Sequence, residues 1–229
     1  MLANLFAFAF PRRGQSQNSA ASGLVPVDFP SPSDLRGGWA ALAAVMSARG
    51  WGDEVFATDT EWHFHDGGGN WATLRFFERD RAVLIGQDHE YSETYFGDAA
   101  QYFGEEETDL LMDAPDWWQQ NLAPGPHGEW LGFIYGWDGT QWQRASYDKE
   151  DGFTFVNLAG ACSLNDLDYI TQHSFDAPGL ADGKPDAKEL QALVAADAQV
   201  TEAMLNDAVP GWDSAAGAVA ARNFLKAPV

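Results

Sequence analysis

Hydrophobic residues recur at helical spacing in the segment that follows residue 33. They are Leu35, Trp39, Leu42, Ala43 and Met46. Side chains three or four positions apart share one face of a helix, so this pattern predicts an amphipathic helix. Ser33 or Asp34 is a suitable N-cap, and Gly50 is typical of the residue that ends a helix.

Short runs rich in β-branched and aromatic residues come next. They cover residues 55–58, 61–66, 71–79 and 81–86. The stretch 66–70 contains three consecutive glycines, and Asp80 marks a second turn. Strands joined by such short turns pair with their neighbours in the chain, so these runs predict an antiparallel meander.

The middle of the chain mixes helical and extended patterns. Residues 98–103 and 106–121 have helical character, although Pro115 can divide the second segment. Extended runs cover residues 129–135, 141–147 and 153–158. The first two predict a hairpin, and its first strand is apolar on both faces, which is typical of a strand covered on both sides.

Small residues dominate the last part of the chain. Helices are expected at residues 163–171, 187–198, 201–208 and 214–225. Strands and helices are segregated along the sequence, so the predicted class is α+β: a small antiparallel meander sheet flanked by helices, with a helical C-terminal extension. The predicted parts are a flexible N-terminal segment and linker at 1–33, a core domain at 34–176 and the extension at 177–229.

Composition supports a folded, cytoplasmic protein. Of the 229 residues, 45% are hydrophobic and 14% are aromatic, which suffices for a sizeable core. Cys162 is the one cysteine of the sequence, so no intramolecular disulfide is possible. The apolar run 1–10 precedes Arg12 and Arg13, the reverse of a secretory signal, and falls short of the roughly 20 residues that cross a bilayer.

Charge narrows the classes of partner. The formal net charge is -21, with 34 acidic and 13 basic residues, which argues against direct binding of nucleic acid because phosphate neutralisation needs clustered Lys and Arg. Neither Lys nor Arg occurs from Ala82 to Gln143, a stretch that we call the base-free segment. Its acids either keep the protein soluble or attract an external cation, whether a metal ion or a basic protein.

A His-x-His pair is the candidate metal-binding motif. Alternation along a strand places His63 and His65 on one face. The candidate ligands of zinc or another divalent metal are His63, His65, Asp66 and His89. The alternative interpretation is an aromatic strand in which Trp62 and Phe64 face the core while the histidines lie on a wetter face.

The preferred functional hypothesis is a non-enzymatic acidic binding protein without a cofactor. Small acidic proteins of the immunity or inhibitor type neutralise basic toxins such as nucleases, because opposite charge speeds encounter. The predicted contact residues are Asp88, Glu90, Glu93, Asp98, Glu105, Glu106, Glu107, Asp109, Trp117 and Trp118. Two alternatives stay open. One is a metal-dependent hydrolase that uses the His-x-His-Asp motif, and the other is an accessory subunit of a homo- or hetero-oligomer, anchored by the apolar N-terminus.

Overall fold

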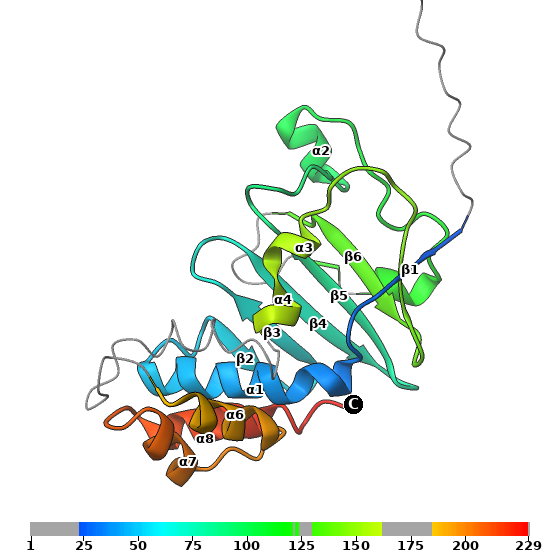
Figure 1. Cartoon of the computed structure of the whole chain (residues 1–229). Coiled ribbons are helices and arrows are strands. Elements are labelled where there is room, and N and C mark those ends of the chain that lie inside the picture. The colour runs from blue at the N-terminus through cyan, green and yellow to red at the C-terminus, as the bar shows by residue number, and fades with distance from the viewer. Residues whose placement is uncertain (1–22, 121, 124–129, 162–184, 229) are drawn as a thin grey trace, which may run out of the picture.

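A seven-stranded antiparallel sheet forms the centre of the molecule (Figure 1). The computed structural model describes residues 23–120, 122–123, 130–161 and 185–228. The strands are β1 (Val25–Val27), β2 (Val55–Ala57), β3 (Glu61–His65), β4 (Trp71–Phe77), β5 (Arg81–Gln87), β6 (Phe133–Trp137) and β7 (Trp142–Arg144). Their order is β1-β7-β6-β5-β4-β3-β2, so β2 to β7 form a meander. This architecture confirms the predicted α+β class.

The first helix, α1 (Pro32–Arg49), lies against one face of the sheet (Figure 1). Its N-cap is Ser31, whose hydroxyl accepts the N–H of Asp34, and Pro32 occupies the first turn, where the missing N–H costs nothing. The predicted cap was two or three residues too late. Gly50 ends the helix in the left-handed conformation, with a φ of 93°, as predicted.

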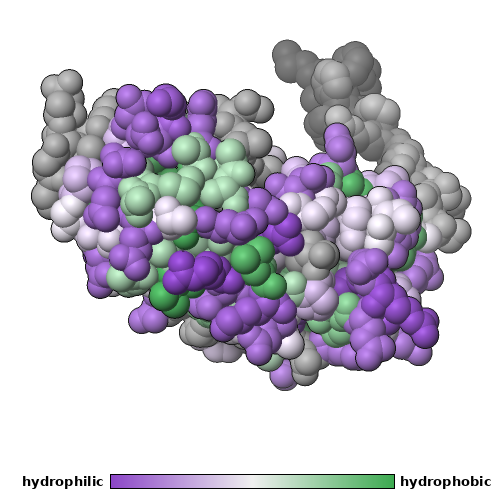
Figure 2. Space-filling view, turned by 90° about the horizontal axis from the view of Figure 1, so that it is seen from below, coloured by the Kyte–Doolittle hydropathy of each residue, from purple (hydrophilic) through white to green (hydrophobic). Residues whose placement is uncertain are grey.

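Three helices lie near the C-terminus. They are α6 (Ala187–Ala195), α7 (Glu202–Ala208) and α8 (Ser214–Asn223). The helices α6 and α8 pack against α1, and α7 packs against α6 and α8. The crossing of α8 over α1 is close, because a Cβ atom at Gly217 would lie 2.5 Å from the carbonyl oxygen of Ala44. Figure 2 shows the outer face of this layer, on which hydrophobic side chains lie among hydrophilic ones.

Apolar side chains fill both faces of the sheet. On the helical face, Trp62, Phe64 and Leu84 pack with Trp39 of α1 and with Phe224, which follows α8. On the opposite face a smaller cluster lies beneath the chain that follows β5. Its buried members are Trp71, Val83, Ile85, Leu110, Trp118, Leu131 and Ile134. The expectation that β6 is covered on both sides is confirmed.

Local structure differs from the prediction in three places. The predicted flexible segment and linker 1–33 contains β1, which pairs with β7 at the sheet edge. In 106–121 the helical part is the 3-10 helix η1 (Asp116–Gln119), because Asp113 is left-handed and Pro115 precedes it. The predicted strand 153–158 is instead divided between α3 (Phe153–Val156) and α4 (Leu158–Ala161).

Local backbone features explain why residues 153–161 form the helices α3 and α4 although their composition favours a strand. Gly152 and Asn157 both have positive φ, 81° and 52°, which turns the chain before and after α3. The carboxylate of Asp151 also accepts the N–H of Phe153 and thereby starts the turn. Cys162 and the predicted helix 163–171 lie outside the described residues. Within the described ranges, no helix is both long and apolar enough to cross a bilayer.

Candidate partner-binding surface

After β5, residues 88–119 of the base-free segment build one end of the molecule. They form the loop 88–97, the short helix α2 (Asp98–Phe103) and an irregular stretch that leads to η1. In Figure 1, α2 lies at the end of the sheet farthest from α6, α7 and α8. The candidate contact residues are therefore carried by loops beyond a rigid sheet, where recognition sites often lie.

Asp88 is buried and stabilises the loop, so it does not lie on the surface. Its side chain is 2% exposed, and its Oδ1 atom accepts the N–H groups of Glu90 and Tyr91 at 3.0 and 2.8 Å. Ser92 completes this turn, since its hydroxyl accepts the N–H of Asp88 and donates to the carbonyl of Asp151. Asp88 thus shapes the loop, and its assignment to the contact surface is corrected.

The other predicted acids are exposed: Glu90, Glu93, Asp98, Glu105, Glu106, Glu107 and Asp109. Glu107 accepts the N–H of Gly97 at 3.3 Å, which ties the two ends of the α2 region together. Lys149 reaches this surface from outside the base-free segment, but it donates to the backbone carbonyl of Glu106. Among the described residues, none of these seven carboxylates forms an ion pair with Lys or Arg.

A hollow of about 700 Å³ lies beside α2 and is lined mainly by apolar residues, four of them aromatic. Its aromatic walls are Phe96, Tyr102, Phe103 and Trp130, with Leu122, Leu131 and Asp98 also at its edge. The ring centroids of Phe103 and Trp130 are 5.0 Å apart, and Tyr95 stacks on Trp130 at 6.1 Å. Tyr102 is 84% exposed and Phe103 is 43% exposed, so large apolar groups meet solvent beside the acids.

The two predicted tryptophan anchors lie elsewhere. Trp118 is 1% exposed, and its indole fills the space above Gly136, where a Cβ atom would lie only 2.0 Å from the ring. It belongs to the core and is not available to a partner, which corrects that assignment. Trp117 is partly buried against Phe77, with the guanidinium of Arg81 4.9 Å from the centre of its ring. The rings around Trp130 were not predicted from the sequence, because their grouping depends on α2 folding toward the start of β6.

The histidines occupy separate environments. His63 and His65 share one face of β3, while Trp62 and Phe64 face the core as one interpretation predicted. His63 is nevertheless fully buried, not on a wetter face, and its Nδ1 atom lies 2.8 Å from the hydroxyl of Thr73. The Nδ1 atom of His65 lies 2.5 Å from a carboxylate oxygen of Glu54.

Asp66 and His89 both form hydrogen bonds with Asn70. The Oδ1 atom of Asp66 accepts the N–H groups of Gly68 and Asn70, and the Asn70 amide donates to its Oδ2 atom at 2.9 Å. The carbonyl of the same amide accepts the N–H of His89. Within the described part of the chain, no three His, Cys, Asp or Glu side chains converge as a metal ion would require.

A buried network that the sequence did not reveal holds α3 against the sheet. The carboxylate of Asp151 accepts hydrogen bonds from the hydroxyls of Tyr135 and Tyr147, each at 2.7 Å. Burial, followed by the negative charge of Asp151, raises the pKa of both phenols above their ordinary value. These three residues therefore fasten the sheet to the segment that also supports Ser92.

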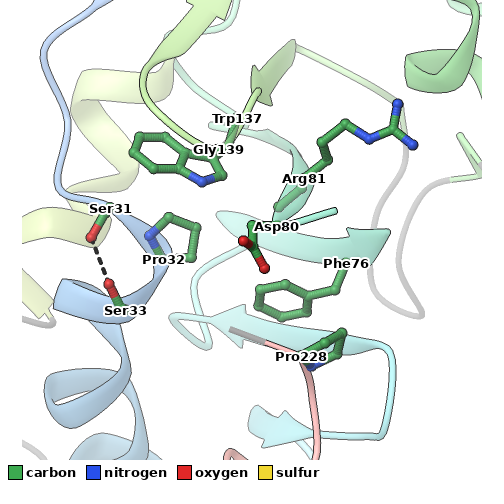
Figure 3. Close-up of a pocket in the computed structure, with 10 residues that line it drawn as sticks. Ser31, Pro32, Ser33, Phe76, Asp80, Arg81, Trp137, Gly139 and Pro228 are labelled. Carbon is green, nitrogen blue, oxygen red and sulfur yellow. Dashed lines mark hydrogen bonds between the residues drawn. The ribbon is translucent and has the colours of Figure 1, made fainter. Parts of the chain in front are cut away.

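A second, smaller hollow of about 180 Å³ lies at the start of α1 (Figure 3). Rings of Pro32, Phe76, Trp137 and Pro228 surround it, and the guanidinium of Arg81 points away from it. The hydroxyls of Ser31 and Ser33 bond to each other at 2.9 Å. These two hydroxyls thus serve the start of the helix, although the side chain of Asp80 also lines the hollow. The hollow beside α2 is larger and is the stronger candidate site.

No protein-family model matches this chain, and the searches of curated proteins and of solved structures found no match either.

Proposed function

We propose that this chain is a non-enzymatic acidic binding protein of the immunity or inhibitor type, and that it engages a basic protein through the α2 surface. We define the α2 surface as the seven exposed acids named above together with the hollow beside α2. The observation that supports this proposal most directly is the combination of exposed carboxylates and exposed rings in a segment without Lys or Arg.

Electrostatics favours a cationic partner. The carboxylates of Glu105, Glu106 and Glu107 are consecutive and exposed, so they repel one another at neutral pH. A basic surface on a partner relieves this repulsion. The carboxylates attract such a surface over roughly 10 Å at 0.1 M salt, which is the Debye length. Charge of this kind mainly accelerates encounter and selects the sign of the partner.

Affinity needs a second contribution, which the exposed rings supply. Aromatic anchors inside a polar rim carry much of the binding free energy in protein interfaces. Tyr102 and Phe103 lie in the middle of the acidic positions along the chain, between Asp98 and Glu105. The α2 surface thus has the composition of an interface, with apolar anchors surrounded by charge.

The test compares two variants with the same change in net charge. The variant Glu105→Lys/Glu106→Lys/Glu107→Lys reverses the α2 surface, whereas Glu78→Lys/Glu202→Lys/Asp207→Lys reverses three exposed acids far from α2. Affinity capture from the native cell extract with the wild-type chain should yield a basic protein, which is then purified. We expect its affinity, measured by calorimetry, to fall at least tenfold for the first variant and much less for the second.

Three results would contradict the proposal. The captured partner could be neutral or acidic, its affinity could be independent of salt, or both charge variants could weaken binding equally. Equal weakening would mean that net charge alone, and not the α2 surface, attracts the partner.

A further inference from the structure

The hollow beside α2 has walls of unusual chemistry for a surface depression. Four of its residues are aromatic, one is the carboxylate-bearing Asp98, and the remainder are apolar or glycine. Among the described residues, no Lys or Arg lines it, and all the lining residues belong to the base-free segment. A ring face carries partial negative charge and the carboxylate is negative, so both favour a ligand of opposite charge, a cation.

We propose that this hollow receives an arginine side chain of the basic partner. The inference rests on the function proposed above and adds the group that the α2 surface recognises. A guanidinium is planar, weakly hydrated and able to stack on a ring while it donates to a carboxylate. In this arrangement it stacks on Tyr102 or Trp130 and donates to Asp98.

Other occupants fit less well. A neutral aliphatic side chain contacts the rings equally but leaves the Asp98 carboxylate without a counter-charge as water is displaced. A lysine ammonium loses more hydration and cannot stack in a plane. The volume of about 700 Å³ exceeds what one side chain fills, so it also admits the residues that flank the arginine.

Capped tripeptides provide the probe. Acetyl-Ala-Arg-Ala-amide is compared with the same peptide carrying citrulline, the neutral isostere of arginine, and with the lysine peptide. Binding to the full chain is followed through the indole N–H signal of Trp130 in two-dimensional NMR, assigned with the variant Trp130→Phe. We expect the arginine peptide to bind about tenfold more tightly than the citrulline peptide, the ratio for a cation held by rings and one carboxylate.

Exposed positions give variants that leave the fold intact. Asp98→Asn and Tyr102→Ala alter the hollow, and Asp207→Asn removes another exposed carboxylate, on α7. We expect the first two to reduce the preference for arginine over citrulline to below threefold, and Asp207→Asn to preserve it.

The outcomes separate the two proposals. Equal binding of the arginine and citrulline peptides overturns the cation site, and equal binding of the arginine and lysine peptides overturns the preference for arginine. Either result leaves the partner proposal to its own charge-reversal test. A clear arginine preference together with the absence of any basic partner would sustain the pocket and overturn the proposed function.

Discussion

Single residues in this protein divide sharply between those that build the fold and those that face solvent. Asp151 belongs to the first kind, because its carboxylate is 6% exposed and has two phenol donors. Glu105 belongs to the second, and no side-chain partner accompanies it among the described residues. Residue type alone does not separate the two, since both are carboxylates.

The Asp151 network predicts a stability loss at alkaline pH. The pKa values of Tyr135 and Tyr147 are raised by folding above the ordinary value of 10.0, so the folded state holds these protons more tightly than the unfolded state. Their contribution is therefore complete below pH 10 and declines as pH rises beyond it. The tyrosinate absorbance that comes from Tyr135 and Tyr147 should change together with circular dichroism, because these two phenols ionise only as the chain unfolds.

Substitution of one phenol checks the same network at neutral pH. We expect Tyr135→Phe to lower the free energy of unfolding by about 1–3 kcal/mol, because one donor to a buried carboxylate is lost. The double variant Tyr135→Phe/Tyr147→Phe should also lose the coincidence of tyrosinate formation and unfolding. A stable Tyr135→Phe variant with an unchanged alkaline transition would show that the network contributes little.

Elements are positioned by close contacts between segments far apart in the chain. Gly136 in β6 and Trp118 in η1 are the clearest case, since the indole occupies the space of a missing side chain. This contact places η1 on the second face of the sheet, where Trp118 and Leu110 belong to the same cluster. The α2 surface therefore depends on packing beneath it as well as on its own residues.

The contact predicts a specific cost for enlarging Gly136. The variant Gly136→Ala should lower the free energy of unfolding by about 1–3 kcal/mol, because the Cβ atom forces the indole of Trp118 out of place. In a double-mutant cycle measured by urea unfolding, Trp118→Leu should relieve part of this loss. Additive losses would mean that Gly136 matters for another reason.

The whole molecule carries its charge unevenly. Its net charge is -21, and the exposed acids of the α2 surface lie at the end of the sheet opposite the C-terminal helices. At low ionic strength these like charges repel one another, and together they create a negative electrostatic potential at that end of the molecule. The proposed basic partner would therefore also relieve this repulsion, which would link recognition to stability.

Salt should reveal this linkage without any partner. The Debye length falls from about 30 Å at 0.01 M to about 3 Å at 1 M salt, so the Tm is expected to rise with NaCl. Each kcal/mol of relieved repulsion corresponds to about 2–4 °C in a chain of this size. The variant Glu105→Gln/Glu106→Gln/Glu107→Gln should have a higher Tm at low salt and a flatter salt dependence. A Tm insensitive to salt would argue against self-repulsion.

The sequence by itself determined the elements that arise from local patterns. The meander strands, α1, α2 and the C-terminal helices follow from periodicity, caps and turn residues that act over a few positions. The acidity of the base-free segment is likewise a property of composition. Its loop character between Asp109 and Pro115 was misread because acids near the start of a segment resemble a helix N-terminus.

Only the tertiary structure decided which of these residues are available for function. Asp88 and Trp118 were predicted as surface contacts from the sequence. In the structure Asp88 is buried within its own turn, and Trp118 is buried against Gly136 of β6. The strand β1 forms because it pairs with β7 at the edge of the sheet. The hollow beside α2 forms because the ring of Trp130 packs against that of Phe103. Burial and proximity arise from contacts between distant segments, and no local pattern encodes them.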